Sequence, residues 1–397
     1  MKRPGVLGWL LAGLGLLGPA VSAPRPALSA PGPARLRLVV VAPEPTLHEG
    51  RIEQTKLRRT LDLTLPATEL AAWRSSGTAI PAALRSLYRQ LETRTPQDAR
   101  FFPDAEGGWT ARAQTGWTVN RAVTGARVRQ ALQDGGREVQ VALRFTPPTR
   151  TVQRLLAAGV RGHIGSGRSA FTGSPAFRVQ NIRVGSALLS GQLLQPGEVF
   201  DFNRALGPIQ AGRGFVPGYV ITGGTLSLED GGGICQVSTT LFRAAYTAGL
   251  PIVERHAHSH QVAYYDPPGF EATVYAPTLN FRFRNDTAGA LLVQASWNLK
   301  AQTLQFDLFG VQRRVVSVSA PRVSGVIPAS PPGFLADPRV APGQAVRVDM
   351  PAQGATVRIE RRITLPDGRV RHDQLLSRYR PWGGVFAVPP GDPRLKR

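Results

Sequence analysis

The chain is nearly free of cysteine, and this scarcity makes its one thiol informative. Cys235 is the only cysteine among 397 residues, so no disulfide within the chain is possible. An isolated cysteine is most often a small buried apolar residue. Here the cysteine lies between three consecutive glycines and a group of histidines, which favours a chemical role instead.

Acidic residues and lysine are also scarce, whereas arginine is abundant. The chain has 26 acidic and 48 basic residues, a formal net charge of +22, and lysine occurs only at positions 2, 56, 300 and 396. The basic residues are dispersed, with no run of five or more and no interleaved aromatic motif. This pattern predicts an arginine-rich surface with weak attraction to anionic wall polymers, and no nucleic-acid partner.

Long apolar runs are absent as well. The N-terminal run from Val6 to Leu17 is shorter than the ~20 residues that a membrane-spanning helix needs. It follows Lys2 and Arg3 and precedes the small residues 21–23, which is the order of a secretory signal peptide. We therefore expect an exported protein of the cell envelope, periplasm or medium. Contact with the membrane is expected only if the signal segment stays uncleaved.

The most informative stretch runs from Gly231 to His260 and reads GGGICQVSTTLFRAAYTAGLPIVERHAHSH. The glycines permit close backbone approaches, and apolar residues recur at helical spacing from Gln236 to a stop at Gly249. This places Cys235 where a glycine loop meets the start of a helix, whose partial positive charge favours the thiolate. An extended run from Pro251 would place the three histidines of the stretch on one side of a strand.

A thiol beside an imidazole is the arrangement for nucleophilic acyl transfer. The imidazole raises the thiolate content and then protonates the leaving group. The glycine loop would offer backbone N–H groups to an oxyanion, with Gly233, Ile234 and Gln236 as the candidates. These residues predict a cysteine-dependent acyltransferase that uses no cofactor.

Four sequence runs carry a resemblance to a known family. They are RVQNIRVGSALLSGQLLQPGEVFDFN from Arg178, GGGICQVSTTL from Gly231, ERHAHS from Glu254 and PPGFEATV from Pro267. Over Phe177 to about Asn285 the chain resembles the VanW family. The resemblance implies a cell-wall protein that acts on peptidoglycan stem peptides. As in some members, it implies an L,D-transpeptidase with Cys235 as nucleophile.

The resemblance also implies roles for other residues. His258, in the His-Ser pair that the family pattern stresses, is expected to be the base and then the acid. His256 would share the same face of the expected strand, and this placement, rather than the resemblance, makes it a candidate for contact with substrate. Glu271 stands where the family usually has aspartate, and either orients the histidine or is a solvent-facing carboxylate. Weaker candidates for binding substrate are Asn203, Tyr219 and Arg255.

Two other functions fit the same residues. A non-catalytic module would bind peptidoglycan or a glycopeptide, with Cys235 buried. A zinc hydrolase of the same polymer would use this thiolate and a His-x-His pair, because zinc accepts both ligand types in a tetrahedral site. Three histidines spaced along one strand span too far to reach one ion comfortably, so we predict no metal.

Composition and local patterns predict an α+β protein with several units. We expect a signal peptide at 1–23, a tether at 24–35, an α+β domain at 36–160, a loop-rich mixed α/β VanW-like catalytic domain at 174–312, a small all-β module at 313–388 and a disordered tail at 389–397. The order of elements in 36–160 resembles the peptidoglycan-binding region that precedes many VanW domains.

Individual elements follow from periodicity and turn residues. Strands are expected at 36–42, 61–65, 139–145, 199–202, 315–319, 346–348, 356–364 and 369–378, and a hairpin from 291–297 and 302–309. Helices are expected at 80–91, 149–158 and 181–189, and from a cap at Thr124 to Gly135. Gly162 to Gly173 is expected to be a glycine- and serine-rich connection that carries a solvated His163.

Overall fold

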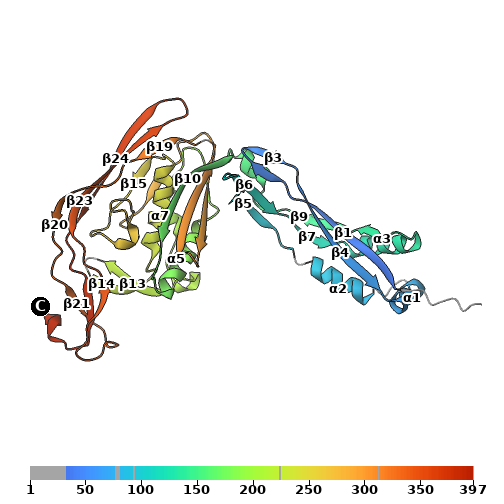
Figure 1. Ribbon diagram of the computed structural model, residues 1–397, viewed down its shortest axis with the longest axis horizontal. Coiled ribbons are helices and arrows are strands. Elements are labelled where there is room, and N and C mark those ends of the chain that lie inside the picture. The colour runs from blue at the N-terminus through green and yellow to red at the C-terminus, as the bar shows by residue number, and fades with distance from the viewer. Residues whose placement is uncertain (1–32, 77–80, 93, 223–224, 312, 397) are drawn as a thin grey trace, which may run out of the picture.

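The computed structural model describes residues 33–76, 81–92, 94–222, 225–311 and 313–396. The strands form several separate sheets and the chain also contains helices, so the fold is α+β as predicted. The N-terminal part extends away from the central part, and the C-terminal strands run along its opposite side (Figure 1). The predicted signal peptide and most of the predicted tether lie outside the described residues. Within these residues, no helix is both long and apolar enough to cross a membrane.

The N-terminal part is built on β1 (Ala34–Pro43), in which apolar residues alternate near its start and then become continuous. β1 pairs antiparallel with β4 (Lys56–Leu65) and parallel with β8 (Glu138–Gln140). Helices α1 (Ala67–Ser76), α2 (Ala82–Leu91) and α3 (Arg121–Gln133) pack their apolar residues against this sheet. The remaining strands are β2 (Thr46–His48), β3 (Arg51–Glu53), β5 (Gln97–Pro103), β6 (Trp109–Gln114), β7 (Gly116–Val119) and β9 (Leu143–Thr146).

The central part is organised around α7 (Ile234–Thr247), which is buried along most of its length. It packs against a four-stranded sheet with the order β10-β18-β17-β11 and against α5 (Ala176–Leu189). The sheet contains β10 (Gly162–Ala170), β11 (Leu193–Leu194) and the predicted hairpin of β17 (Leu291–Asn298) and β18 (Thr303–Gly310). The surrounding elements are α4 (Val152–Ala157), β12 (Val199–Asp201), α6 (Phe202–Leu206), β13 (Pro217–Thr222), β14 (Thr225–Asp230), β15 (Ile252–Glu254) and β16 (Arg282–Arg284).

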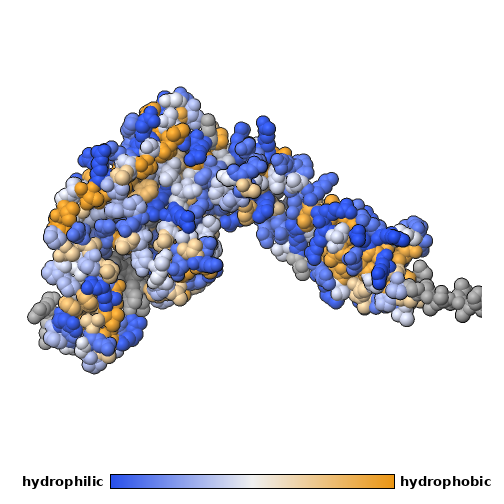
Figure 2. All heavy atoms as spheres, viewed as in Figure 1, coloured by the Kyte–Doolittle hydropathy of each residue, from blue (hydrophilic) through white to orange (hydrophobic). Residues whose placement is uncertain are grey.

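The C-terminal part is dominated by the long hairpin of β23 (Gly354–Thr364) and β24 (Val370–Tyr379). Ile359 and Leu375 of this hairpin belong to the same apolar core as α7, so the hairpin is continuous with the central part. Other apolar residues of this part are exposed, and Figure 2 shows apolar patches along it. Its other elements are β19 (Val315–Val318), β20 (Arg322–Ile327), β21 (Gly333–Ala336), β22 (Val346–Asp349), β25 (Val385–Val388) and the 3-10 helix Pro393–Lys396.

The predicted connection at 162–173 is wrong, because most of it is the strand β10. Its glycines allow the strand to approach α7 closely rather than to form a loop. A Cβ atom at Gly167 would lie 2.0 Å from the carbonyl oxygen of Thr240, and one at Gly165 would lie 2.7 Å from Ala248. Only glycine fits where the backbones of strand and helix meet this closely.

Other local predictions are wrong as well. The predicted disordered tail at 389–397 contains the 3-10 helix Pro393–Lys396, and α5 begins at Ala176 rather than at residue 181. His163 is packed rather than solvated, since its ring stacks on Trp109 with centroids 5.1 Å apart. Helix α3 begins after Asn120, whose side chain caps the first turn, and not at Thr124. The predicted strand at 139–145 divides between β8 and β9, which belong to different sheets.

Gly167→Ala should destabilise the protein by about 1–3 kcal/mol, because the added methyl group must displace β10 or α7. Gly162→Ala is the matched control on the same strand, since nothing lies within 4 Å of a Cβ atom there. We expect the control to change the free energy of unfolding by less than about 0.5 kcal/mol. Chemical denaturation of both variants measures the difference, and equal midpoints would contradict the close contact.

Candidate active site

Cys235 lies in the first turn of α7, two residues after a glycine that sets how the helix begins. Gly233 has a φ of 112°, which side chains rarely adopt, and a Cβ atom there would lie 3.0 Å from Arg178 Cγ. Part of Cys235 remains accessible to solvent. Its sulfur lies 3.4 Å from Thr273 Oγ1 and 3.5 Å from the Val274 carbonyl oxygen. The structure thus places the thiol where a loop meets a helix start.

His258 is the imidazole that the fold brings to this thiol. Its side chain is 14% exposed, and its ring stacks on Tyr265 with centroids 4.7 Å apart. The ring is close enough to Cys235 for the two groups to shift each other's pKa, and Nδ1 lies 3.3 Å from Glu271 Oε2. The angle at Nδ1 departs from that of a good hydrogen bond. Electrostatic attraction between the imidazolium and the carboxylate therefore contributes more to this contact than a directional hydrogen bond does. Nε2 is then the nitrogen that faces the sulfur.

Glu271 completes a thiol–imidazole–carboxylate chain. The residue is 1% exposed, so it is not the solvent-facing carboxylate of the alternative prediction. The Tyr379 hydroxyl donates a hydrogen bond to its Oε1. The guanidinium of Arg255 donates to its backbone carbonyl oxygen at 2.6 Å. Glu271 is therefore held by hydrogen bonds both at its side-chain carboxylate and at its backbone carbonyl.

Opposite pKa shifts follow from this arrangement. Burial raises the pKa of the Cys235 thiol, but the hydrogen bond and charge of His258, with a further bond from Thr273, outweigh burial and lower the pKa to about 7. Burial lowers the pKa of His258, but its interactions with the Cys235 thiolate and with the Glu271 carboxylate outweigh burial and raise the pKa to about 9. Between these values the pair exists as thiolate and imidazolium.

The charge of Glu271 is preserved in the same way. Burial raises the pKa of this carboxyl group, but the close contact and charge of His258 and the hydrogen bond of Tyr379 outweigh burial and lower the pKa. The carboxylate therefore stays ionised wherever the thiolate exists.

The other two histidines of the motif contact different partners. The predicted strand through all three is wrong, because β15 ends at Glu254. His256 forms an isolated bridge with Thr273, and its Nε2 lies 3.0 Å from Glu254 Oε1. His260 is buried, and its ring stacks on Trp382 with centroids 4.7 Å apart. Neither of these contacts reaches the thiol.

The predicted oxyanion donors are partly engaged within the first turn itself. The Ile234 amide donates to the Gly231 carbonyl and the Gln236 amide to the Gly233 carbonyl, each at 3.0 Å. The Gln236 side chain is fully buried and hydrogen-bonded to neighbouring elements. The amides of Gly233 and Cys235 have no acceptor among the loop and cap hydrogen bonds of the described residues, so these two amides are the candidate donors to an oxyanion.

The weaker candidates for substrate binding serve the fold. Asn203 Nδ2 donates to the Leu279 carbonyl oxygen at 2.9 Å. The three guanidinium nitrogens of Arg255 donate to Glu271, Gly269 and Ser377. Tyr219 lies on β13, and its side chain is outside the described part of the molecule. The geometry therefore gives no support to substrate contact by Asn203 or Arg255.

Tyr379 was missed by sequence reasoning. It lies in the predicted C-terminal module, 108 residues beyond Glu271, so no local spacing in the sequence connects the two residues. Thr273 and Tyr265 were also missed, although both lie within or beside the PPGFEATV run.

No group of three or more His, Cys, Asp or Glu side chains is placed to hold a metal ion within the ranges that the structure describes.

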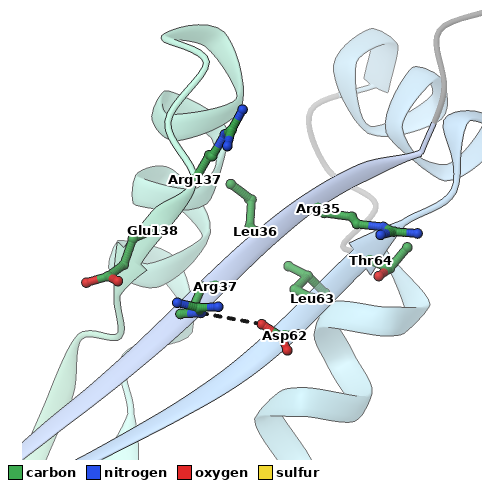
Figure 3. Close-up of a pocket in the computed structure, with 8 residues that line it drawn as sticks. All are labelled: Arg35, Leu36, Arg37, Asp62, Leu63, Thr64, Arg137 and Glu138. Carbon is green, nitrogen blue, oxygen red and sulfur yellow. Dashed lines mark ion pairs between the residues drawn. The ribbon is translucent and has the colours of Figure 1, made fainter.

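A separate pocket lies in the N-terminal part, on β1, β4 and the start of β8 (Figure 3). It is lined by Arg35, Leu36, Arg37, Asp62, Leu63, Thr64, Arg137 and Glu138. Arg37 and Asp62 pair across the two strands at 3.6 Å, and both side chains are largely exposed. This mixture of exposed charges selects no class of ligand, so the cluster at Cys235 is the candidate active site.

The family assignment rests on the part of the chain that carries this cluster. Residues 177–309 match the family described as VanW like protein, and the match contains Cys235, His258 and Glu271. This part of the chain therefore belongs to the VanW family.

Two curated proteins are similar to the chain. "Uncharacterized protein YoaR" of Bacillus subtilis is 38% identical over 141 residues, which cover 36% of this chain and 46% of that protein. "Vancomycin B-type resistance protein VanW" of Enterococcus faecalis is 30% identical over 116 residues, which cover 28% and 42%. The matched segments span less than half the length of either relative. No solved structure matches the chain significantly.

Alkylation of Cys235 should follow a pKa of about 7. In His258→Ala the thiol loses its imidazolium partner, and burial then holds its pKa at ~9 or above. At pH 7 the thiolate population falls about fiftyfold, but a more basic thiolate is several times more nucleophilic. The labelling rate should therefore fall about fivefold to tenfold. Iodoacetamide labelling of the folded protein between pH 5 and 9, read by mass spectrometry, measures this profile.

His256→Ala is the matched variant, because its ring contacts Glu254 rather than the thiol. It should leave the labelling profile unchanged. A wild-type profile that follows a pKa near ~9, or an equal loss of labelling in the two histidine variants, would contradict the pairing of Cys235 with His258.

Proposed function

We propose that the protein is an exported cell-wall enzyme, a thiol-dependent L,D-transpeptidase that forms peptidoglycan crosslinks. The observation that carries this proposal is the chain of Cys235, His258 and Glu271 inside the VanW-family region. Family membership supports a cell-wall-related protein, and one relative carries the name of a vancomycin B-type resistance protein. The substrate class rests on that relationship, whereas the type of reaction rests on the geometry.

In the first step the Cys235 thiolate attacks the carbonyl carbon that follows an L-configured centre of the donor stem peptide. The carbon–sulfur bond forms, and the negative charge moves to the carbonyl oxygen, which the Cys235 amide stabilises. The carbon–nitrogen bond then breaks, and the His258 imidazolium gives its proton to the departing amine of D-alanine. The product is a thioester on Cys235 and a neutral imidazole.

In the second step an amine from a neighbouring stem attacks the thioester. His258 takes a proton from this amine, the new carbon–nitrogen bond forms, and the carbon–sulfur bond breaks. The sulfur leaves as the thiolate, so the resting ion pair is restored without any net change of charge. Glu271 remains ionised throughout and stabilises each imidazolium state.

Export is part of the proposal and is supported by the signal-like residues 1–23. Peptidoglycan lies outside the cytoplasm, so an enzyme that joins its stems must meet them there. The proposed partners are peptidoglycan stem peptides, with weaker attraction to anionic wall polymers through the net charge of +22.

Cys235→Ala should abolish crosslinking, with a loss of at least about a thousandfold, because no other thiol is present. The assay incubates the purified full chain with donor and acceptor muropeptides and measures the crosslinked dimer by mass spectrometry. The intact mass of the wild type should rise by the mass of the acyl group, and that of Cys235→Ala should not.

His372→Ala is the control, since His372 is an exposed histidine on β24 that lies outside the site. It should retain wild-type crosslinking, whereas His258→Ala should lose about a hundredfold or more. Crosslinking that survives in Cys235→Ala would overturn the proposal. Binding of muropeptides by the wild type with no product and no acyl-enzyme would show a non-catalytic binding module instead.

A further inference from the structure

Tyr379 reaches the active site from the end of the C-terminal hairpin. It is the last residue of β24 and is 5% exposed. Its hydroxyl oxygen accepts a hydrogen bond from the Gly269 amide at 2.7 Å. A phenol has one hydrogen to donate, and here that hydrogen goes to Glu271 Oε1. The direction of this bond is therefore set, and it stabilises an ionised carboxylate.

The same strand also supports the backbone of Glu271. Ser377 lies two residues before Tyr379, so both side chains are on the same face of β24. The Ser377 hydroxyl accepts from Arg255 at 2.9 Å, and Arg255 in turn donates to the Glu271 carbonyl oxygen at 2.6 Å. Ser377 is fully buried. One strand thus holds Glu271 at its carboxylate and, through Arg255, at its main chain.

The hairpin is anchored to the helix that carries the thiol. Arg361 of β23 is 2% exposed and donates to the carbonyl oxygens of Tyr246 and Leu250 at 2.8 and 3.1 Å. Tyr246 lies in the last turn of α7, where a cation is favoured by the helix dipole, and Leu250 follows three residues after the helix ends. Arg361 also pairs with Asp373 of β24. The position of Tyr379 is therefore coupled to α7, whose other end carries Cys235.

We infer that Tyr379 is a positioning residue for the Glu271 carboxylate, so that the C-terminal hairpin completes the active site of the VanW-family region. The catalytic consequence rests on the proposed function, whereas the effect on the thiol does not. Nδ1 of His258 meets Glu271 Oε2 at 3.3 Å with a poor hydrogen-bond angle. A carboxylate that is held on Oε1 is less free to rotate its other oxygen away from this contact.

Loss of the Tyr379 hydroxyl should weaken the charged groups of the site one after another, from Glu271 to His258 to Cys235. Glu271 would lose the side-chain donor on Oε1, and its buried carboxyl group would become easier to protonate. A less charged and less ordered carboxylate stabilises the His258 imidazolium less. The imidazolium in turn stabilises the Cys235 thiolate less, so the thiol titrates at higher pH.

Tyr379→Phe tests this sequence of effects. The midpoint of the alkylation profile of Cys235 should move up by about one pH unit, and labelling at pH 7 should fall about twofold. Crosslinking should fall about tenfold, the scale on which residues that orient a catalytic group act. Thermal unfolding of each variant shows that the labelled protein is folded.

Tyr246→Phe is the matched control. Tyr246 is also a buried tyrosine whose hydroxyl bonds to a carboxylate of β24, since it lies 3.4 Å from Asp373 Oδ1. It makes no contact with Glu271 among the hydrogen bonds of the described residues. The alkylation profile of Tyr246→Phe should therefore match that of the wild type.

A double-mutant cycle with Glu271→Gln then identifies the route of the effect. If Tyr379 acts through Glu271, Tyr379→Phe should change the alkylation profile little in the Glu271→Gln background. An unchanged profile in Tyr379→Phe, an equal shift in Tyr246→Phe, or fully additive shifts in the cycle would overturn the inference. A shifted profile together with no crosslinking by the wild type would remove the proposed function and leave the positioning role in place.

Discussion

The arrangement of the central and C-terminal parts depends on the burial of one charged group, the carboxylate of Glu271. A carboxylate that is 1% exposed needs a cation or hydrogen-bond donors in place of water. His258 supplies the cation, Tyr379 supplies a donor, and Arg255 holds the main chain beside it. These partners come from the loop after β15 and from the end of β24. The packing of loop and hairpin is therefore inseparable from the charge state of the site.

The buried polar residues of α7 hold the thiol and the carboxylate in register. Ser238 and Thr239 are fully buried, and both hydroxyl groups donate to the carbonyl oxygen of Ala272, at 2.6 and 3.1 Å. Ala272 directly follows Glu271 and precedes Thr273, which contacts the Cys235 sulfur. Serine and threonine within a helix usually compete with its backbone, but here they join the helix to the neighbouring segment. A shift of either segment would break several hydrogen bonds together.

Sequence patterns predicted the elements that depend on residues close together in the chain. The helix start at Cys235 and the β17–β18 hairpin follow from glycine placement and alternation, and both are present. The sequence predicts a connection in place of β10, because glycines that allow close packing against α7 cannot be distinguished in a sequence from glycines of a loop. Tyr379 had no local signal, since its partner is distant in the chain and the contact exists only after the hairpin packs. The resemblance to the VanW family predicted His258 as the partner of the thiol. The spacing of the three histidines along the chain did not distinguish them.

The order of these groups along the chain has a consequence for biosynthesis. Cys235, His258 and Glu271 are all made before the hairpin that holds the Glu271 carboxylate in place. A nascent chain that has emerged only as far as β18 carries the whole reactive set without β24, and so without the groups that orient it. The thiol should therefore acquire its full reactivity only after β24 has been made and has packed against the central part.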